Sequence, residues 1–206
     1  MRRFALKKAL LFFFLSVMTI GIASAQPSAD PVCRCTYYAR WTDAENRLVE
    51  DTLILEMGRG IDLWYKKGNL PDRSPFAIID SLVAEGIVPA PDDFVPSFDD
   101  CLVLNYPIGY DTVIRTDDGL SVAMIPRRFE KWEVVVETRR IQGFLTMAHC
   151  RTLAGYSWKA WATLELGFCF SGPWWLNNAP GLIVEAEDAE GRVFFQLVSL
   201  ETTEKN

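Results

Sequence analysis

The stretch Gly172–Asp188 reads Gly-Pro-Trp-Trp-Leu-Asn-Asn-Ala-Pro-Gly-Leu-Ile-Val-Glu-Ala-Glu-Asp and joins a punctuated loop directly to a strand. The dipeptides Gly172-Pro173 and Pro180-Gly181 are typical of turns, because their backbone angles are either fixed or unusually permissive. From Leu182 onward, apolar and acidic residues alternate with the period of a half-buried strand. A loop with two adjacent tryptophans must either be pinned under the fold or present its rings to a partner.

Short strand-like runs surround this stretch, and most are separated by turn signals such as Thr116–Gly119 and Asp188–Gly191. Parallel strands need long crossover connections, so closely spaced runs of this kind predict an antiparallel meander. Several runs are apolar on both faces, which predicts either a covering helix or a ligand surface. The predicted strands are 102–106, 110–115, 120–125, 132–137, 141–151, 157–166, 182–187 and 193–200.

One helix interrupts the strand pattern. Ser74 and Pro75 form a typical helix start, apolar residues follow at helical spacing from Phe76 to Val83, and Gly86 is placed to end the helix. Upstream, Gly58–Gly60 divides two apolar runs and predicts a hairpin turn. We therefore predict a mainly β fold, an antiparallel sheet with one helix packed on it.

The N-terminal residues 1–25 are typical of a cleaved signal peptide. A basic segment precedes an apolar run, and Ala23–Ala25 fits the small-x-small cleavage rule. The leader carries four basic residues and no acidic one, so its removal changes the net charge from −6 to −10. An acidic exported chain is a poor partner for nucleic acid. Residues 26–206 are thus predicted to be one periplasmic or secreted domain, without a transmembrane span after cleavage.

Five cysteines in an exported chain predict up to two disulfides and one remaining thiol. Cys150 and Cys169 would close a loop of about 20 residues, which stabilises by about 3 kcal/mol. Cys33, Cys35 and Cys101 cannot all pair with one another. The Cys33–Cys35 spacing resembles a metal-binding pair, but no second cluster accompanies it. A disulfide from Cys35 to Cys101 is therefore the prediction, and no metal or cofactor is expected.

Chemical groups for catalysis are few. His149 is the only histidine, and its neighbour Cys150 points to the opposite face of a regular strand, so the two cannot form a nucleophile–base pair. Ser171 lacks the glycine that a nucleophile elbow requires two residues earlier. Paired carboxylates such as Glu133 with Glu137 would suit glycoside hydrolysis, but the chain has 27 acidic residues and such pairs arise by chance.

Tryptophans are the strongest candidates for a binding surface. Trp161, Trp174 and Trp175 are the candidate ligand-binding or partner-binding residues. The alternative is that the rings fold under the sheet as a strap. That interpretation is favoured for Trp158 and Trp174, while both alternatives stay open for Trp161 and Trp175.

Several blocks in their order carry a family resemblance: Glu137–Phe144, Cys150, Ala160–Thr163 and the sequence Ala-Pro-Gly-Leu-Ile at 179–183. Over about residues 101–200 the chain resembles the GLPGLI family, exported proteins of Bacteroidetes without an agreed activity. A similar domain forms a bowl-shaped module in some secreted glycosidases, which implies a strongly curved sheet, a bowl or half-barrel. Some members lie beside outer-membrane transporters, which implies a partner in the envelope.

The sequence thus predicts an exported envelope protein that binds a small apolar or sugar ligand, or an outer-membrane transport partner, without catalysis. A secreted hydrolase acting through paired carboxylates is the first alternative, and a purely structural interaction module is the second.

Overall fold

The structure is a computed structural model that describes residues 28–43, 45–86, 89–91, 94, 96–116, 119–127, 131–166 and 171–202. The predicted signal peptide and Cys169 lie outside these residues. The described residues form eleven strands and one helix. The elements are β1 (Ser28–Thr42), β2 (Leu48–Arg59), β3 (Asp62–Lys66), α2 (Pro75–Glu85), β4 (Cys101–Leu104), β5 (Tyr110–Arg115), β6 (Ser121–Pro126), β7 (Glu133–Ile141), β8 (Phe144–Leu153), β9 (Tyr156–Thr163), β10 (Leu182–Asp188) and β11 (Val193–Thr202).

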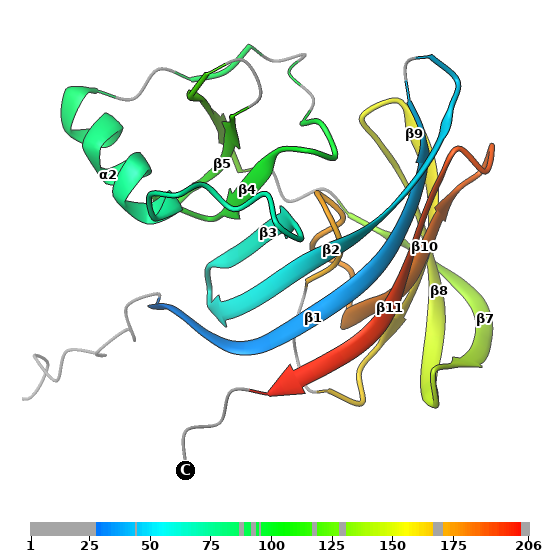
Figure 1. Cartoon of the computed structure of the whole chain (residues 1–206). Helices are drawn as coiled ribbons and strands as arrows, with labels where there is room; N and C mark the ends of the chain where they lie inside the picture. The colour runs from blue at the N-terminus through cyan, green and yellow to red at the C-terminus, as the bar shows by residue number, and fades with distance from the viewer. Residues whose placement is uncertain are drawn as a thin grey trace, which may run out of the picture.

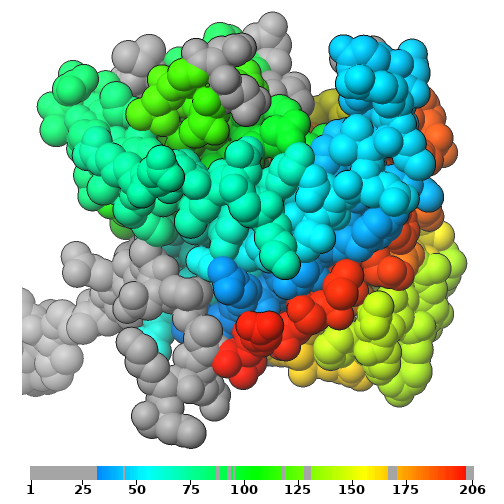
Figure 2. All heavy atoms as spheres, in the orientation of Figure 1, coloured from blue at the N-terminus to red at the C-terminus, as the bar shows by residue number. Residues whose placement is uncertain are grey.

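All eleven strands belong to a single antiparallel sheet, in the order β6-β5-β4-β3-β2-β1-β11-β10-β9-β8-β7. The first and last strands therefore pair in the middle, with Ala39 opposite Phe195. Figure 2 shows β1 in blue and β11 in red next to each other across the face in view. From this centre, β1 to β6 extend to one edge, and β11 back to β7 extend to the other. The predicted antiparallel meander is confirmed.

Chain connectivity requires the sheet to curl. Its two edge strands, β6 and β7, are consecutive in the sequence. A flat sheet with ten inter-strand steps of about 4.8 Å would be about 48 Å wide. The seven residue steps from Pro126 to Glu133 span at most about 25 Å. The sheet must therefore bend its edges toward each other. Because β6 and β7 are not hydrogen-bonded neighbours, the curved sheet stays open.

The two faces of the sheet carry separate cores. We call the face that bears Tyr37, Trp64 and Phe195 the inner face, and it holds the larger apolar cluster. The opposite, outer face carries a second cluster over β2 to β6, where Ile78 and Ile79 of α2 are buried. In Figure 1, α2 lies beside β4 and β5. A helix over half of the sheet explains why β3 and β4 are apolar on both faces, as predicted.

The predicted disulfide between Cys35 and Cys101 is wrong. The described residues contain no disulfide. Cys35 belongs to the inner cluster and Cys101 to the cluster under α2, so the two side chains point to opposite faces. Three inter-strand steps, about 14 Å in all, also separate β1 from β4, whereas a disulfide tolerates Cα separations up to about 7 Å. Cys150 is a half-buried free thiol in the structure.

Candidate binding site

Residues 171–181, which we call the strap, lie across the inner face between β9 and β10. Trp174, Leu176 and Ala179 are fully enclosed, with at most 1% of Trp174 exposed. The Trp174 ring lies 4.6 Å from Phe98 and 6.1 Å from Trp158, measured between ring centroids. The strap therefore completes the core inside the curve of the sheet, where Figure 1 shows it in orange.

Two glycines of the quoted stretch are explained by close backbone approaches. A Cβ on Gly172 would lie 2.2 Å from the carbonyl oxygen of Leu176, within the strap itself. Gly181 has a φ of +105°, and a Cβ there would lie 2.1 Å from the carbonyl oxygen of Thr163 at the end of β9. Only glycine fits such positions without strain. The turn dipeptides predicted from the sequence thus let the strap pack directly on the strand ends.

Hydrogen bonds hold the middle of the strap to the far side of the sheet. The Trp132 indole donates to the carbonyl oxygen of Asn177 over 2.9 Å, and the Arg151 guanidinium donates to the same oxygen over 3.2 Å. Just beyond the strap, at the start of β10, the Tyr37 hydroxyl donates to the carbonyl oxygen of Ile183 over 2.6 Å. Buried backbone carbonyls need such partners, so these side chains fix one position of the strap.

The start of the strap meets the other half of the sheet through a polar group. The Ser171 hydroxyl donates to Oδ2 of Asp62, at the first position of β3. Nearby, the Asp111 carboxylate accepts hydrogen bonds from the Trp175 indole over 3.3 Å and from Arg127 over 3.0 Å. Strap, β3, β5 and the segment after β6 therefore converge at this end of the inner face.

A cavity of about 500 Å³ opens beside these groups, and we call it the mouth cavity. Its wall is mainly apolar, with the Asp62 carboxylate, the Ser171 hydroxyl and the Arg127 guanidinium as polar groups. This combination, an apolar wall with a few placed polar groups, is typical of small-molecule sites. The lining side chains include Met57, Asp62, Arg127, Leu166, Ser171 and Leu200.

Burial changes the acidity of this site. Loss of solvation raises the pKa of Asp62, and the Ser171 hydrogen bond and the Arg127 charge oppose the rise without cancelling it. The neighbouring Asp111 charge adds to the rise. Burial disfavours the charged form of a carboxyl group, so the Asp62 carboxyl is a desolvated polar group beside the cavity.

The three predicted binding tryptophans are not brought together. Trp174 is buried under the sheet as a core residue. Trp161 is also only 2% exposed, but it lies on the outer face, where Arg139 covers its ring at 3.9 Å and Lys159 at 4.9 Å. Trp175 is half-buried beside Asp111, next to the groups that line the mouth cavity. Of the three, Trp175 is the one close to the candidate site.

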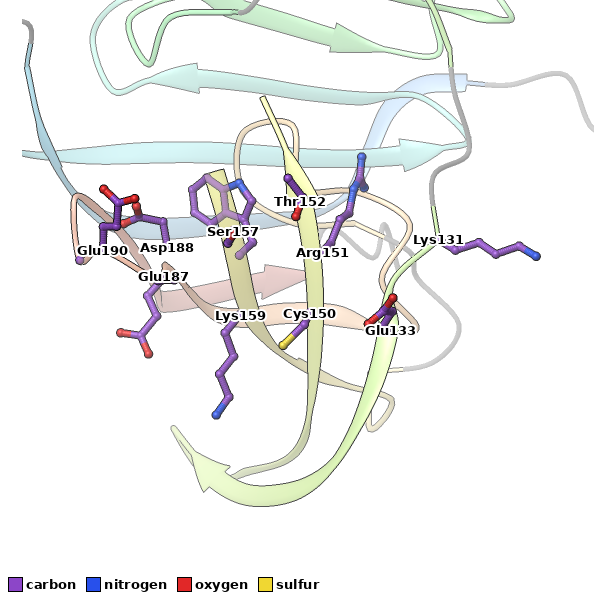
Figure 3. Close-up of a pocket in the computed structure, with 13 residues that line it drawn as sticks. Lys131, Glu133, Cys150, Arg151, Thr152, Ser157, Lys159, Glu187, Asp188 and Glu190 are labelled. Carbon is purple, nitrogen blue, oxygen red and sulfur yellow. The ribbon is translucent and has the colours of Figure 1, made fainter. Parts of the chain in front are cut away.

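A second, larger cavity of about 910 Å³, the outer cavity, lies on the outer face over β7 to β10. Its centre is a row of side chains in direct cross-strand register, Glu133, Cys150, Lys159 and Glu187. Figure 3 shows them on neighbouring strands, with Cys150 between Lys159 and Glu133. The charged lining suits solvent and ion pairs better than an apolar ligand.

The catalytic candidates are accounted for by the structure. Of the predicted carboxylate pair, Glu137 forms a salt bridge with Lys159 over 2.7 Å, and Glu133 lines the outer cavity. His149 points to the inner face, where burial lowers its pKa, away from Cys150. Among the described residues, no group of three or more His, Cys, Asp or Glu side chains is arranged for a metal ion.

Sequence reasoning missed Asp62, Asp111 and Arg127. The hydrogen bond between Ser171 and Asp62 joins residues 109 positions apart, so no local pattern could reveal it. A weak signal was present in Asp62 itself, an acidic residue inside an otherwise apolar run that directly follows a glycine turn.

Comparisons with known proteins concern the fold. No family model and no curated protein matches the chain. Two crystal forms of PNGF-II are similar, with 12% identity in each. The P21 form has a TM-score of 0.53 over 85% of this chain and 29% of PNGF-II, and the C2 form has 0.54 over 84% and 28%. The chain thus spans less than a third of the length of PNGF-II.

A LolA-superfamily protein from Nitrosomonas europaea aligns with 87% of this chain and 89% of its own, at 6% identity and a TM-score of 0.33. That score is too low to support an inference. The likeness to PNGF-II establishes a shared fold and nothing about its chemistry. Within the described residues, no helix combines the length and apolarity needed to cross a bilayer.

Proposed function

We propose that this chain is a non-catalytic binding protein that takes a small, largely apolar ligand in the mouth cavity. The observation that carries the proposal is the cavity itself, about 500 Å³ with an apolar wall and three convergent polar groups. Pockets for small ligands have volumes of about 300–1,000 Å³ and similar linings. Burial of the ligand's apolar surface would supply most of the affinity.

The polar groups restrict the ligand further. Asp62 and Ser171 are already hydrogen-bonded to each other, and Arg127 is paired with Asp111 over 3.0 Å. A strongly ionic ligand would therefore have to break these existing bonds before it could pair with either group. A ligand with an apolar body and one hydroxyl, amide or similar group would match it, because that group could exchange hydrogen bonds with Asp62.

The compartment and the partner are part of the same proposal. The leader at 1–25 supports export to the periplasm or the cell surface. The resemblance to the GLPGLI family supports work beside an outer-membrane transporter. In that setting, a carrier would shield an apolar molecule from water between membrane and transporter.

The test is a fluorescence titration of the purified chain with Nile red, an uncharged apolar dye, followed by displacement with long-chain alcohols. A charge on the wall should weaken dye binding by at least about tenfold, equivalent to about 1.4 kcal/mol. Leu166→Glu adds this charge in the mouth cavity, where Leu166 is 37% exposed and tolerates a polar side chain.

Leu145→Glu is the matched control. Leu145 is 49% exposed on β8 and does not line the mouth cavity. The proposal predicts unchanged dye affinity for this variant. Equal binding by wild type and Leu166→Glu would contradict the proposed site, and weakening in both variants would indicate a general surface effect instead.

A further inference from the structure

Three sulfur atoms gather at the wall of the mouth cavity. Cys33 and Cys35 are two positions apart on β1, so their side chains share the inner face. Met57 of β2 is the direct cross-strand partner of Cys33, which places the Cβ atoms of the two residues about 4.5–5.5 Å apart. Cys33 and Met57 both line the cavity, whereas Cys35 is fully buried behind them.

Strand geometry keeps the two cysteines from forming a disulfide with each other. Residues two positions apart on a strand are separated by about 6.6 Å with parallel Cα–Cβ bonds. A disulfide needs Cβ atoms about 3.5–4.5 Å apart. Cys101 points to the opposite face, and Cys150 lies on β8 in the other half of the sheet. In the structure both Cys33 and Cys35 are thiols, and the strand ladder keeps them from forming a disulfide with each other.

A dithiol beside a thioether has a definite ligand preference. Thiolate and thioether sulfurs are soft donors that select copper(I). Zinc instead favours four nitrogen, oxygen or thiolate ligands in a closed tetrahedron, and the described residues contain no cluster of that kind. The Cys33 and Cys35 side chains are within hydrogen-bonding reach of each other, so a single ion can contact both sulfur atoms.

We propose that Cys33, Cys35 and Met57 form a three-sulfur site for copper(I) at the wall of the mouth cavity. The incoming Cu⁺ replaces the thiol protons, which pass to solvent, and no electron is transferred. The Met57 thioether binds without releasing a proton. Cys33 is the entry ligand because it is half-buried and faces the cavity. This proposal does not depend on the binding of an apolar ligand.

The test is an anaerobic titration of the reduced chain with copper(I) buffered by bicinchoninate. We expect one Cu⁺ per chain and loss of this site in Cys33→Ser and in Cys35→Ser. Met57→Leu keeps the side-chain volume and should weaken copper binding by at least about tenfold, a loss typical of altered metal surroundings. Because Cys35 is buried, thermal unfolding of each variant checks folding, and Met57→Leu tests the site without touching a thiol.

Cys150→Ser is the matched control, because it removes a half-buried thiol from the outer cavity and should leave copper binding unchanged. A parallel titration with zinc and a chromophoric chelator should show no competition at comparable free metal. Copper binding that survives Cys33→Ser, that is unaffected by Met57→Leu, or that is weaker than zinc binding would overturn the proposal. Nile red binding by Met57→Leu, measured separately, shows whether the apolar site persists when copper affinity falls.

Discussion

The inner and outer faces of β7 to β11 differ in the side chains that bury a tryptophan on each. Each face buries a tryptophan almost completely, Trp174 at 1% exposure inside and Trp161 at 2% outside. Trp174 is enclosed by aromatic rings, including Phe98 and Trp158. Trp161 is enclosed by the charged side chains of Arg139 and Lys159. Low exposure alone therefore does not distinguish a residue packed among aromatic rings from one covered by charged side chains.

The largest expected effect is on the stability of the inner face. Trp174→Ala removes the centre of the strap and should lower the free energy of unfolding by about 3–5 kcal/mol, the usual cost of a large cavity. Trp161→Ala should cost less, about 1–2 kcal/mol, because the loss of cation–π contacts is partly offset when Arg139 and Lys159 regain water. Urea unfolding of both variants measures the difference. Equal losses would show that the two faces are equivalent cores.

The second expected effect concerns two thiols on the outer face. Burial raises the pKa of Cys101, under α2, to about 12, whereas Cys150 is half-buried in the outer cavity. At pH 8 and without reductant, Cys101 should alkylate about a hundredfold more slowly than an ordinary exposed thiol. We expect iodoacetamide to label Cys150 first, and Cys101 only after unfolding, as read by peptide mass spectrometry.

The same experiment examines the predicted pairing of Cys150 with Cys169, a residue outside the described part of the chain. Labelling of Cys150 that requires prior reduction would support that disulfide and contradict the free thiol of the structure. Prompt labelling of Cys101 would instead show that the cluster under α2 opens readily.

The smallest expected effect is a pH dependence of stability that comes from His149. Burial on the inner face lowers the pKa of His149 below its ordinary value of 6.5. As the pH falls through 6.5, the unfolded chain takes up a proton before the folded chain does, so stability is lost. His149→Gln should flatten this loss between pH 7.5 and 5.5 in urea unfolding. Because His149 is the only histidine, identical slopes for variant and wild type would contradict the assignment.

Local patterns predicted much of this fold. Turn residues around short runs predicted the antiparallel meander, and Ser74, Pro75 and Gly86 do flank α2. The expectation that the Trp158 and Trp174 rings fold under the sheet agrees with their burial and proximity, with Trp174 in the strap and Trp158 on β9. These features depend on residues close in sequence, whose conformational preferences hold before any tertiary contact forms.

Long-range arrangement could not be predicted in the same way. Alternation shows which residues of one strand share a face, but it does not relate the faces of distant strands. Cys35 and Cys101 were therefore paired in error. The register of β7 against β8 also shifts at a bulge between Val135 and Thr138, and no turn residue in the sequence indicates this bulge. The mouth cavity depends on Asp62 and Ser171 from opposite halves of the sheet, and only the pairing of β1 with β11 brings those halves together.

The pairing of the first strand with the last has a consequence for biosynthesis. Cys33 is opposite Thr202 and Trp41 is opposite Val193, so the central seam joins residues made at the start and end of this stretch of chain. Contacts this distant in sequence slow folding. During synthesis, the edge of β1 that pairs with β11 stays unpaired until β11 has been made. Exposed strand edges of this kind promote aggregation. A chain that is exported before it folds would not expose this unpaired edge inside the cell.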